Sequence, residues 1–347
     1  RWAQTARFVM RRPVAVVMLS LIVLTVLAAP IKNIVFSQVD SRVLPASNSA
    51  ALASKIISDR FPGQEGNPIE IIVPNGATMG TQINQYTNEI AQVPGIVRIG
   101  DSQVSGNDVR VTAIHSMGPR TPAAEVLIKD IRKIRAPEGT LIGGVAADYA
   151  DTQIGIAKTM PWALLWIAIG VLILLFVFTG SIILPIKAII LNILSLGATL
   201  GVITWIFVDG HLKWLVGDFT VTGSVDTGSI ILVAVVAFGL SMDYEVFLLS
   251  RIKEEHDAGR SNVESVATGL QRSARIITAA AGLLAIVFAS FMLSGVTSIK
   301  MLGFGVAFAI LLDASLVRAL LVPALMRLFG ERNWWAPKAM KRFTINH

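Results

Sequence analysis

An acid beside a phenol in an apolar segment is the feature of this sequence most able to do chemistry. Asp243 and Tyr244 are adjacent in the run GSIILVAVVAFGLSMDYEVFLLS, residues 228–250. A carboxylate deep in a membrane helix costs about 2.5–3.5 kcal/mol, so such acids are normally retained for function. The pair therefore predicts a proton relay. The structural alternatives are that Asp243 only bonds a neighbouring helix and that Tyr244 only satisfies it or anchors the helix.

Other polar residues lie in the neighbouring apolar segments. Asp313 precedes Arg318 by five residues, close enough for a local or interhelical pair, so a structural salt bridge and a functional role both stay open. Thr278 is a further polar residue of the fifth segment. Glu245 is closer to the predicted helix end, where we expect it to reach toward water.

Small residues accompany these acids at helical spacing. Gly239 lies four residues before Asp243 and shares its face, and Gly305, Ala309 and Asp313 are each four apart. Small residues allow neighbouring helices to approach closely in a membrane. We therefore expect the last three helices to pack tightly, with their acids facing protein rather than lipid.

Six segments must position these residues. The chain of 347 residues is 53% hydrophobic and 15% charged, unlike most soluble domains. Segments long enough to cross the roughly 30 Å hydrocarbon layer lie near 13–30, 160–179, 185–208, 229–250, 276–294 and 301–326. The composition and these segments predict a membrane α-helical bundle.

The charge distribution predicts the orientation of the bundle. Basic residues precede the first segment, fill the 251–275 linker and follow the last segment, whereas the short opposite loops hold Lys213 and Lys300. The positive-inside rule then places both termini and the linker in the cytoplasm. The net charge of +7 thus reflects topology with some attraction to membrane lipid, and we expect no nucleic-acid partner.

Residues 31–158 have the composition of an ordinary extracytoplasmic domain. We predict an amphipathic helix near 47–62, followed by a βαββαβ unit of the ferredoxin-like α/β type. Its elements are expected at 69–74, 81–93, 95–101, 108–115, 121–135 and 140–145, with Thr121 as an N-cap. The predicted organisation is a cytoplasmic segment and first transmembrane helix (1–30), this outer subdomain (31–158), a five-helix transmembrane domain (159–326) and a basic cytoplasmic tail (327–347).

Enzymatic chemistry has little support in this sequence. We find no nucleophile–base pair, phosphate loop or metal-ligand spacing. The chain has no cysteine, and His115 is alone on its predicted strand. We therefore expect no enzyme activity, cofactor or metal, with protons as the coupling ion.

The run FGLSMDYEVFLLSRIKEE (238–255) resembles the relay helix of the MmpL (mycobacterial membrane protein large) branch of the resistance-nodulation-division (RND) transporters. The segments 181–211 and 301–330 and the NWWAP of 333–337 agree, so the resemblance covers essentially the whole chain. It implies Asp243 as proton carrier, Tyr244 as its hydrogen-bond partner, and an equivalent pair facing them from another half. It also implies export of envelope lipids, including mycolic-acid esters, across the inner membrane.

The resemblance is to the second half of such transporters. The first half is absent, and the chain starts at Arg1 without Met, so we expect a fragment, or a half that pairs with another chain or with itself. A SecD/SecF-like translocation accessory is one alternative, although the DYEVFLLSR motif argues against it. A sterol-sensing or scaffold membrane protein, with a structural acid and no proton flux, is another.

Overall fold

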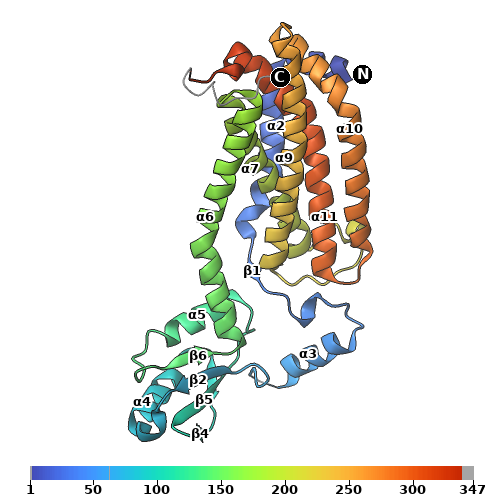
Figure 1. Cartoon of the computed structure of the whole chain (residues 1–347). Coiled ribbons are helices and arrows are strands. Elements are labelled where there is room, and N and C mark those ends of the chain that lie inside the picture. The colour runs from blue at the N-terminus through green and yellow to red at the C-terminus, as the bar shows by residue number, and fades with distance from the viewer. Residues whose placement is uncertain (1, 62, 338–347) are drawn as a thin grey trace. The chain divides into compact units, whose positions relative to one another are not determined.

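The computed structural model describes residues 2–61 and 63–337, and the chain divides into two units (Figure 1). Residues 1–34 and 163–347 form a helical unit, and residues 35–162 form an outer unit that contains the sheet. The predicted tail at 327–347 is described only as far as Pro337. Lys338, Lys341 and Arg342, which contribute to its basic character, lie outside the described residues, as does Arg1.

Six helical stretches of the described chain are long and apolar enough to cross a membrane, which confirms the six predicted segments. They are Pro13–Asn33, Val145–Thr179, Ile183–Val208, Thr227–Asp257, Asn262–Leu293 and Thr297–Trp334. Several stretches are longer than predicted because polar turns continue the helix beyond the apolar run.

The helical unit is built from helices with few interruptions. In chain order they are α1 (Trp2–Arg11), α2 (Pro13–Ala28), η1 (Ala29–Asn33), α6 (Val145–Thr179, shared with the outer unit), α7 (Ile183–Ile203), η4 (Thr204–Val208), α8 (Lys213–Val216), α9 (Thr227–Asp257), α10 (Asn262–Ser290), η5 (Phe291–Leu293), α11 (Thr297–Leu312), η6 (Asp313–Leu321), α12 (Val322–Phe329) and η7 (Gly330–Trp334), and the short strand β7 (Val225–Asp226) precedes α9. The segments η4 and η6 are π-helical. In these segments the backbone bonds run from i to i+5 instead of i to i+4.

The predicted linker at 251–275 is not a separate segment between two membrane helices. Helix α9 continues to Asp257, and α10 starts at Asn262. Ser261 caps α10 by accepting the amide of Glu264, the serine–glutamate pattern of a capping box. Gly259, at φ +84°, permits the reversal. The linker is thus the joined ends of two membrane helices.

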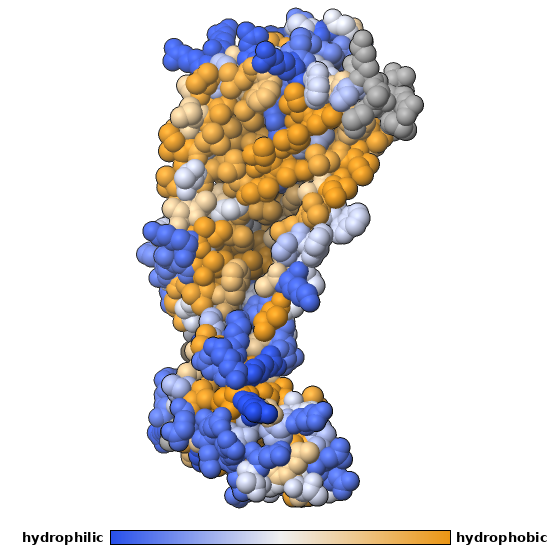
Figure 2. All heavy atoms as spheres, turned by 90° about the vertical axis from the view of Figure 1, so that its left-hand side faces the viewer, coloured by the Kyte–Doolittle hydropathy of each residue, from blue (hydrophilic) through white to orange (hydrophobic). Residues whose placement is uncertain are grey.

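Helix α9 packs against α7, α10 and α11 (Figure 1). Apolar side chains dominate the visible outer surface of the helical unit, and hydrophilic side chains gather at the end that carries α1 and the α9–α10 turn (Figure 2). We call this end the α1 end. Helix α6 buries only 11% of its apolar window, so most of that surface requires lipid or another protein.

The outer unit holds an antiparallel sheet with two helices on one face. Its elements are β1 (Phe36–Ser37), η2 (Ser41–Val43), α3 (Ser49–Arg60), β2 (Ile69–Val73), η3 (Gly76–Thr78), α4 (Gly80–Ala91), β3 (Ile96–Ile99), β4 (Gln103–Ser105), β5 (Asp108–His115), α5 (Pro122–Ile131) and β6 (Leu141–Gly143). The strand order is β3-β5-β2-β6, and β4 also pairs with β5.

Alternation on β2 decides which face of this sheet is covered. Ile69, Ile71 and Val73 are buried against apolar side chains of α4 and α5. The register pairs Ile71 with Val111 of β5 and with Ile142 of β6. A one-residue slip would turn the whole apolar set to the other face, so this pattern fixes the register.

Three details of this unit differ from the predictions. Thr121 makes no capping bond, because its hydroxyl donates to the carbonyl of Gly118 at 2.7 Å. Strand β4 was not predicted. Helix α3, predicted as amphipathic, has no buried residue in the structure.

Candidate functional site

Helix α9 carries the predicted relay residues on one long element. Asp226 starts it by accepting the amide of Ser229 at 2.7 Å. Asp243 is exposed in this unit, and so are Gly239, Val235 and Leu232, which share its face. Asp243 therefore does not face protein within the described chain, and the expectation that it faces protein rather than lipid stays a prediction.

The opposite face of α9 carries an acid whose predicted position was wrong. Glu245 is only 4% exposed and does not reach water as predicted. Asn192 of α7 donates its Nδ2 to Glu245 Oε2 at 3.5 Å and to the carbonyl of Ala188 at 3.2 Å. Glu245 therefore belongs to the α7–α9 interface. Residues two apart on a helix lie on different faces, so Glu245 and Asp243 point in different directions.

Asp313 and Arg318 form the buried ion pair that was one of the two predicted possibilities. The two residues are 6% and 3% exposed, and Asp313 Oδ2 lies 2.6 Å from Arg318 Nη2. Both belong to the π-helical η6, whose i to i+5 geometry brings positions five apart onto one side. Burial of either charge alone would cost several kcal/mol, so the pairing is what allows both to stay.

Arg318 connects this pair to α9. Its Nη2 donates to the backbone carbonyl and, at 3.3 Å, to the hydroxyl oxygen of Ser241. Its guanidinium carbon lies 5.1 Å from the ring centre of Tyr244, a cation–π contact. Tyr244 thus contacts a buried cation on one side, while its sequence neighbour Asp243 is exposed.

The guanidinium of Arg318 is incompletely satisfied. Its Nε and Nη1 are buried and have no hydrogen-bond acceptor within the described residues. Buried donors are nearly always bonded in folded proteins. The Nε and Nη1 groups of Arg318 can therefore each donate a hydrogen bond to a further partner, in addition to the bonds with Asp313 and Ser241.

The small residues named from the sequence have different surroundings. Gly305 and Ala309 are buried, and a Cβ on Gly305 would come within 2.6 Å of Ile203 Cδ1. Gly239 has open space where a Cβ would be. Thr278 is exposed on α10, and the bonds described above for Asp313, Arg318, Ser241 and Tyr244 do not include it.

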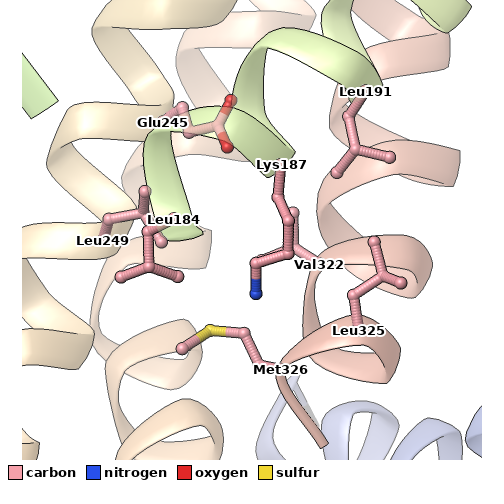
Figure 3. Close-up of a pocket in the computed structure, with 8 residues that line it drawn as sticks. All are labelled: Leu184, Lys187, Leu191, Glu245, Leu249, Val322, Leu325 and Met326. Atoms are coloured by element: carbon pink, nitrogen blue, oxygen red, sulfur yellow. The ribbon is translucent and has the colours of Figure 1, made fainter. Parts of the chain in front are cut away.

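The polar residues near Glu245, which are Lys187, Asn192 and Asn333, are not among the residues predicted from the sequence. Lys187 of α7 donates its Nζ to Asn333 Oδ1 of η7. Lys187 and Glu245 line the same small cavity between α7, α9 and α12 (Figure 3). The sequence does indicate Lys187 and Asn192, because both are polar residues inside the predicted apolar span 185–208.

Metal binding has no geometric support in the described part of the chain, where no group of three or more potential side-chain ligands occurs. His115 is buried in the outer unit, and its Nε2 donates to the carbonyl oxygen of Asn67 at 3.1 Å. Burial lowers the pKa of His115 below its ordinary value. This bond joins the end of β5 to the loop between α3 and β2.

Comparison with known proteins places this arrangement in a family. The model of the MMPL family matches residues 42–345. The chain belongs to the MMPL family. The match includes most of the outer unit and every membrane helix except α2.

Curated relatives are similar to this chain over almost its whole length. A putative membrane protein of Streptomyces coelicolor is 36% identical over 98% of the chain and 47% of its own length. The trehalose monomycolate exporter MmpL3 of Mycobacterium tuberculosis is 33% identical over 98% of the chain and 38% of its length. The mycolic acid-containing lipids exporter MmpL11 of Mycolicibacterium smegmatis is 32% identical over 97% and 37%. The chain therefore spans less than half the length of these relatives.

Proposed function

We propose that this chain is one half of a proton-motive-force-driven lipid exporter of the inner membrane. Two relatives that cover 97–98% of the chain are named as exporters of mycolic-acid lipids. Six candidate spans support a multi-pass membrane protein. Mycolic-acid-type or related acyl lipids are the proposed substrate class.

The proposed orientation has the α1 end in the cytoplasm. Basic side chains flank the helices at this end, among them Arg11, Arg251 and Arg272. Lys213 and Lys300 belong to the loops at the other end. Such an asymmetry favours the basic side as the cytoplasmic side. Residues 31–158 are then extracytoplasmic, and the strand order of the sheet in this segment supports a ferredoxin-like porter subdomain.

The observation that carries the proposal is the position of Asp243. An acid in a membrane helix whose side chain is exposed needs either water or a protein partner. Gly239 on the same face leaves room for another helix to approach closely. A second half of the transporter, meeting this face, is the proposed partner.

Proton binding at Asp243 would bias the packing of the two halves. A neutral Asp243 can enter an apolar interface, whereas a charged one favours water or a cation. The guanidinium of Arg318 lies 5.1 Å from the ring centre of Tyr244, the residue after Asp243, so a fixed positive charge contacts the tyrosine of the proposed relay pair. Each protonation state thus favours a different arrangement of the facing helices, which is how titration can be coupled to transport.

Lipid transport into or out of vesicles tests this proposal. The chain, assembled with its second half, is reconstituted with a pH gradient, and wild type is compared with Asp243→Asn. We expect a protonophore to abolish transport by the wild type, and the folded variant to be inactive. Transport that survives both treatments would reject proton coupling, and no transport by the wild type would favour a sensor or scaffold.

A further inference from the structure

A small cavity brings a half-buried lysine near a buried glutamate without a direct ion pair. Lys187 of α7 and Glu245 of α9 line it, and the remaining lining side chains are leucine, valine and methionine (Figure 3). The cavity has about 10 Å³ of free volume. About 10–15 Å³ is enough for one water molecule. Within the described residues, neither side chain forms a salt bridge.

Asn333 holds the ammonium group of Lys187. Its Nδ2 donates to the carbonyls of Met326 at 2.8 Å and Gly330 at 2.6 Å. These two acceptors fix the orientation of the amide, so that Oδ1 faces Lys187 and accepts from its Nζ. The Phe329 ring lies 4.9 Å from the same Nζ.

Lys187 lies between the buried acid and the α1 end. It is half-buried, close to the start of α7, and its partner Asn333 follows α12. Glu245 is fully inside the bundle and has Asn192 as a hydrogen-bond partner. The order along this path is therefore Glu245, the cavity, Lys187 and then the end of the bundle.

We propose that Lys187 is the proton carrier that connects Glu245 to the cytoplasm. This inference rests on the proposed function and its orientation. The ammonium of Lys187 releases one proton to cytoplasmic water and becomes a neutral amine. The carboxylic acid of Glu245 then gives its proton, through a water in the cavity, to that amine. Glu245 ends as a carboxylate, Lys187 as an ammonium, and one proton has left the membrane.

Two substitutions separate a carrier from a fixed charge. Arginine keeps its positive charge at all working pH values and cannot release a proton, whereas methionine has neither charge nor proton. A carrier is lost in both Lys187→Arg and Lys187→Met. If Lys187 instead only balances the charge of Glu245, Lys187→Arg keeps that function.

Lys300 provides the matched control. It is buried, whereas Lys187 is half-buried, and the Nζ of Lys300 donates to the carbonyl of Val216, the last residue of α8, at 3.3 Å. This contact is at the end of the bundle opposite α1. The same substitutions at Lys300 test the general cost of altering a buried lysine. They leave the Glu245 cavity untouched.

The experiment measures proton-driven lipid transport and substrate counterflow in proteoliposomes containing the assembled transporter. Counterflow exchanges labelled for unlabelled lipid without net proton movement, so it reports folding and binding. We expect Lys187→Arg to lower proton-driven transport at least tenfold while counterflow stays within about twofold of wild type. Lys300→Arg should retain both activities.

Three results would overturn the proposal. Proton-driven transport by Lys187→Arg at the wild-type rate would make Lys187 a fixed charge, and transport by Lys187→Met would make it dispensable. Loss of counterflow together with transport in both variants would make it a structural clamp for Asn333. In each case the wild type remains sensitive to a protonophore, so the proposed function survives; insensitivity of the wild type would remove both.

Discussion

Among single residues, Asp313 and Arg318 form a buried ion pair within this largely apolar bundle. The pair lies 2.6 Å apart and also contacts Ser241 and Tyr244 of α9. A buried pair of this kind is often no more stabilising than apolar residues of similar size, whereas the loss of one partner is costly. This asymmetry gives a test of its role.

We predict that Asp313→Asn lowers the free energy of unfolding by about 3–5 kcal/mol, because it leaves Arg318 charged and unpaired in the bundle. The double variant Asp313→Leu with Arg318→Met should recover most of this loss, since no buried charge remains. Unfolding of the detergent-solubilised protein, followed by heat or denaturant, measures both values.

Transport by the double variant provides the control. If the pair acts in proton coupling, the double variant is stable and inactive. A stable double variant that still transports lipid in response to a pH gradient would reduce the pair to a structural element.

The types of the site residues could be read from the sequence, but their surroundings could not. Asp243, Asp313 and Arg318 stand out because charges are rare in apolar segments. The burial of Glu245 and the exposure of Asp243 depend on which face of α9 packs against α7, and no local pattern specifies that face. Lys187 and Asn333 are 146 residues apart, so their contact is a product of the fold.

At the scale of elements, glycines determine how closely the helices approach. A Cβ on Gly201 of α7 would overlap the backbone oxygen of Leu27 in α2. At Gly305 the nearest atom, at 2.6 Å, is the flexible end of Ile203, and at Gly239 no atom lies within 4 Å. The three positions therefore form a graded series.

We predict that alanine destabilises the protein in the order Gly201, Gly305, Gly239. Gly201→Ala should cost about 1–3 kcal/mol, because backbone must move to relieve the overlap. Gly239→Ala should leave unfolding unchanged and instead reduce transport, since its face is the proposed contact with the second half. Equal stability losses at all three positions would contradict this order.

His115 makes the stability of the outer unit depend on pH. Burial lowers its pKa in the folded state, whereas the unfolded chain has the ordinary value near 6.5. Between these values the unfolded state binds more protons, so stability falls as pH decreases below about 6.5, by at most about 1.4 kcal/mol per pH unit.

Pulse proteolysis in urea at pH 7.5 and 5.5 measures this effect on the outer unit. We expect the urea midpoint to fall at pH 5.5 in the wild type. In His115→Gln the pH dependence should be smaller, whatever the variant's stability at pH 7.5. An unchanged pH dependence in the variant would assign the effect to other groups.

The elements themselves were largely predictable. Strand β5 has the bounds 108–115 that alternation predicted, and all six apolar segments are helices. The π-helix η6 was not predictable, because its i to i+5 bonds depend on tertiary packing rather than on propensity. The extension of α9 and α10 into the 251–275 linker does not follow from hydropathy, because the apolar runs end before the helices do, although the capping box at Ser261 is visible in the sequence.

At the scale of the whole molecule, the helical unit has surfaces that a single half does not cover. Helix α6 is 11% buried over its apolar window, and the face of α9 that carries Asp243 is exposed. The MMPL relatives are more than twice as long as the matched region. These facts agree with a transporter whose proton site is completed by a second half, as in transporters built from repeats.

Substrate-dependent proton flux tests directly whether Asp243 carries the proton that drives lipid export. Vesicles containing the assembled transporter and a trapped pH-sensitive dye receive lipid substrate under a pH gradient, and wild type is compared with Asp243→Asn. We expect substrate-dependent proton movement in the wild type and none in Asp243→Asn. Lys300→Arg should show the same proton flux as the wild type. Equal proton flux in wild type and Asp243→Asn would contradict this role of Asp243.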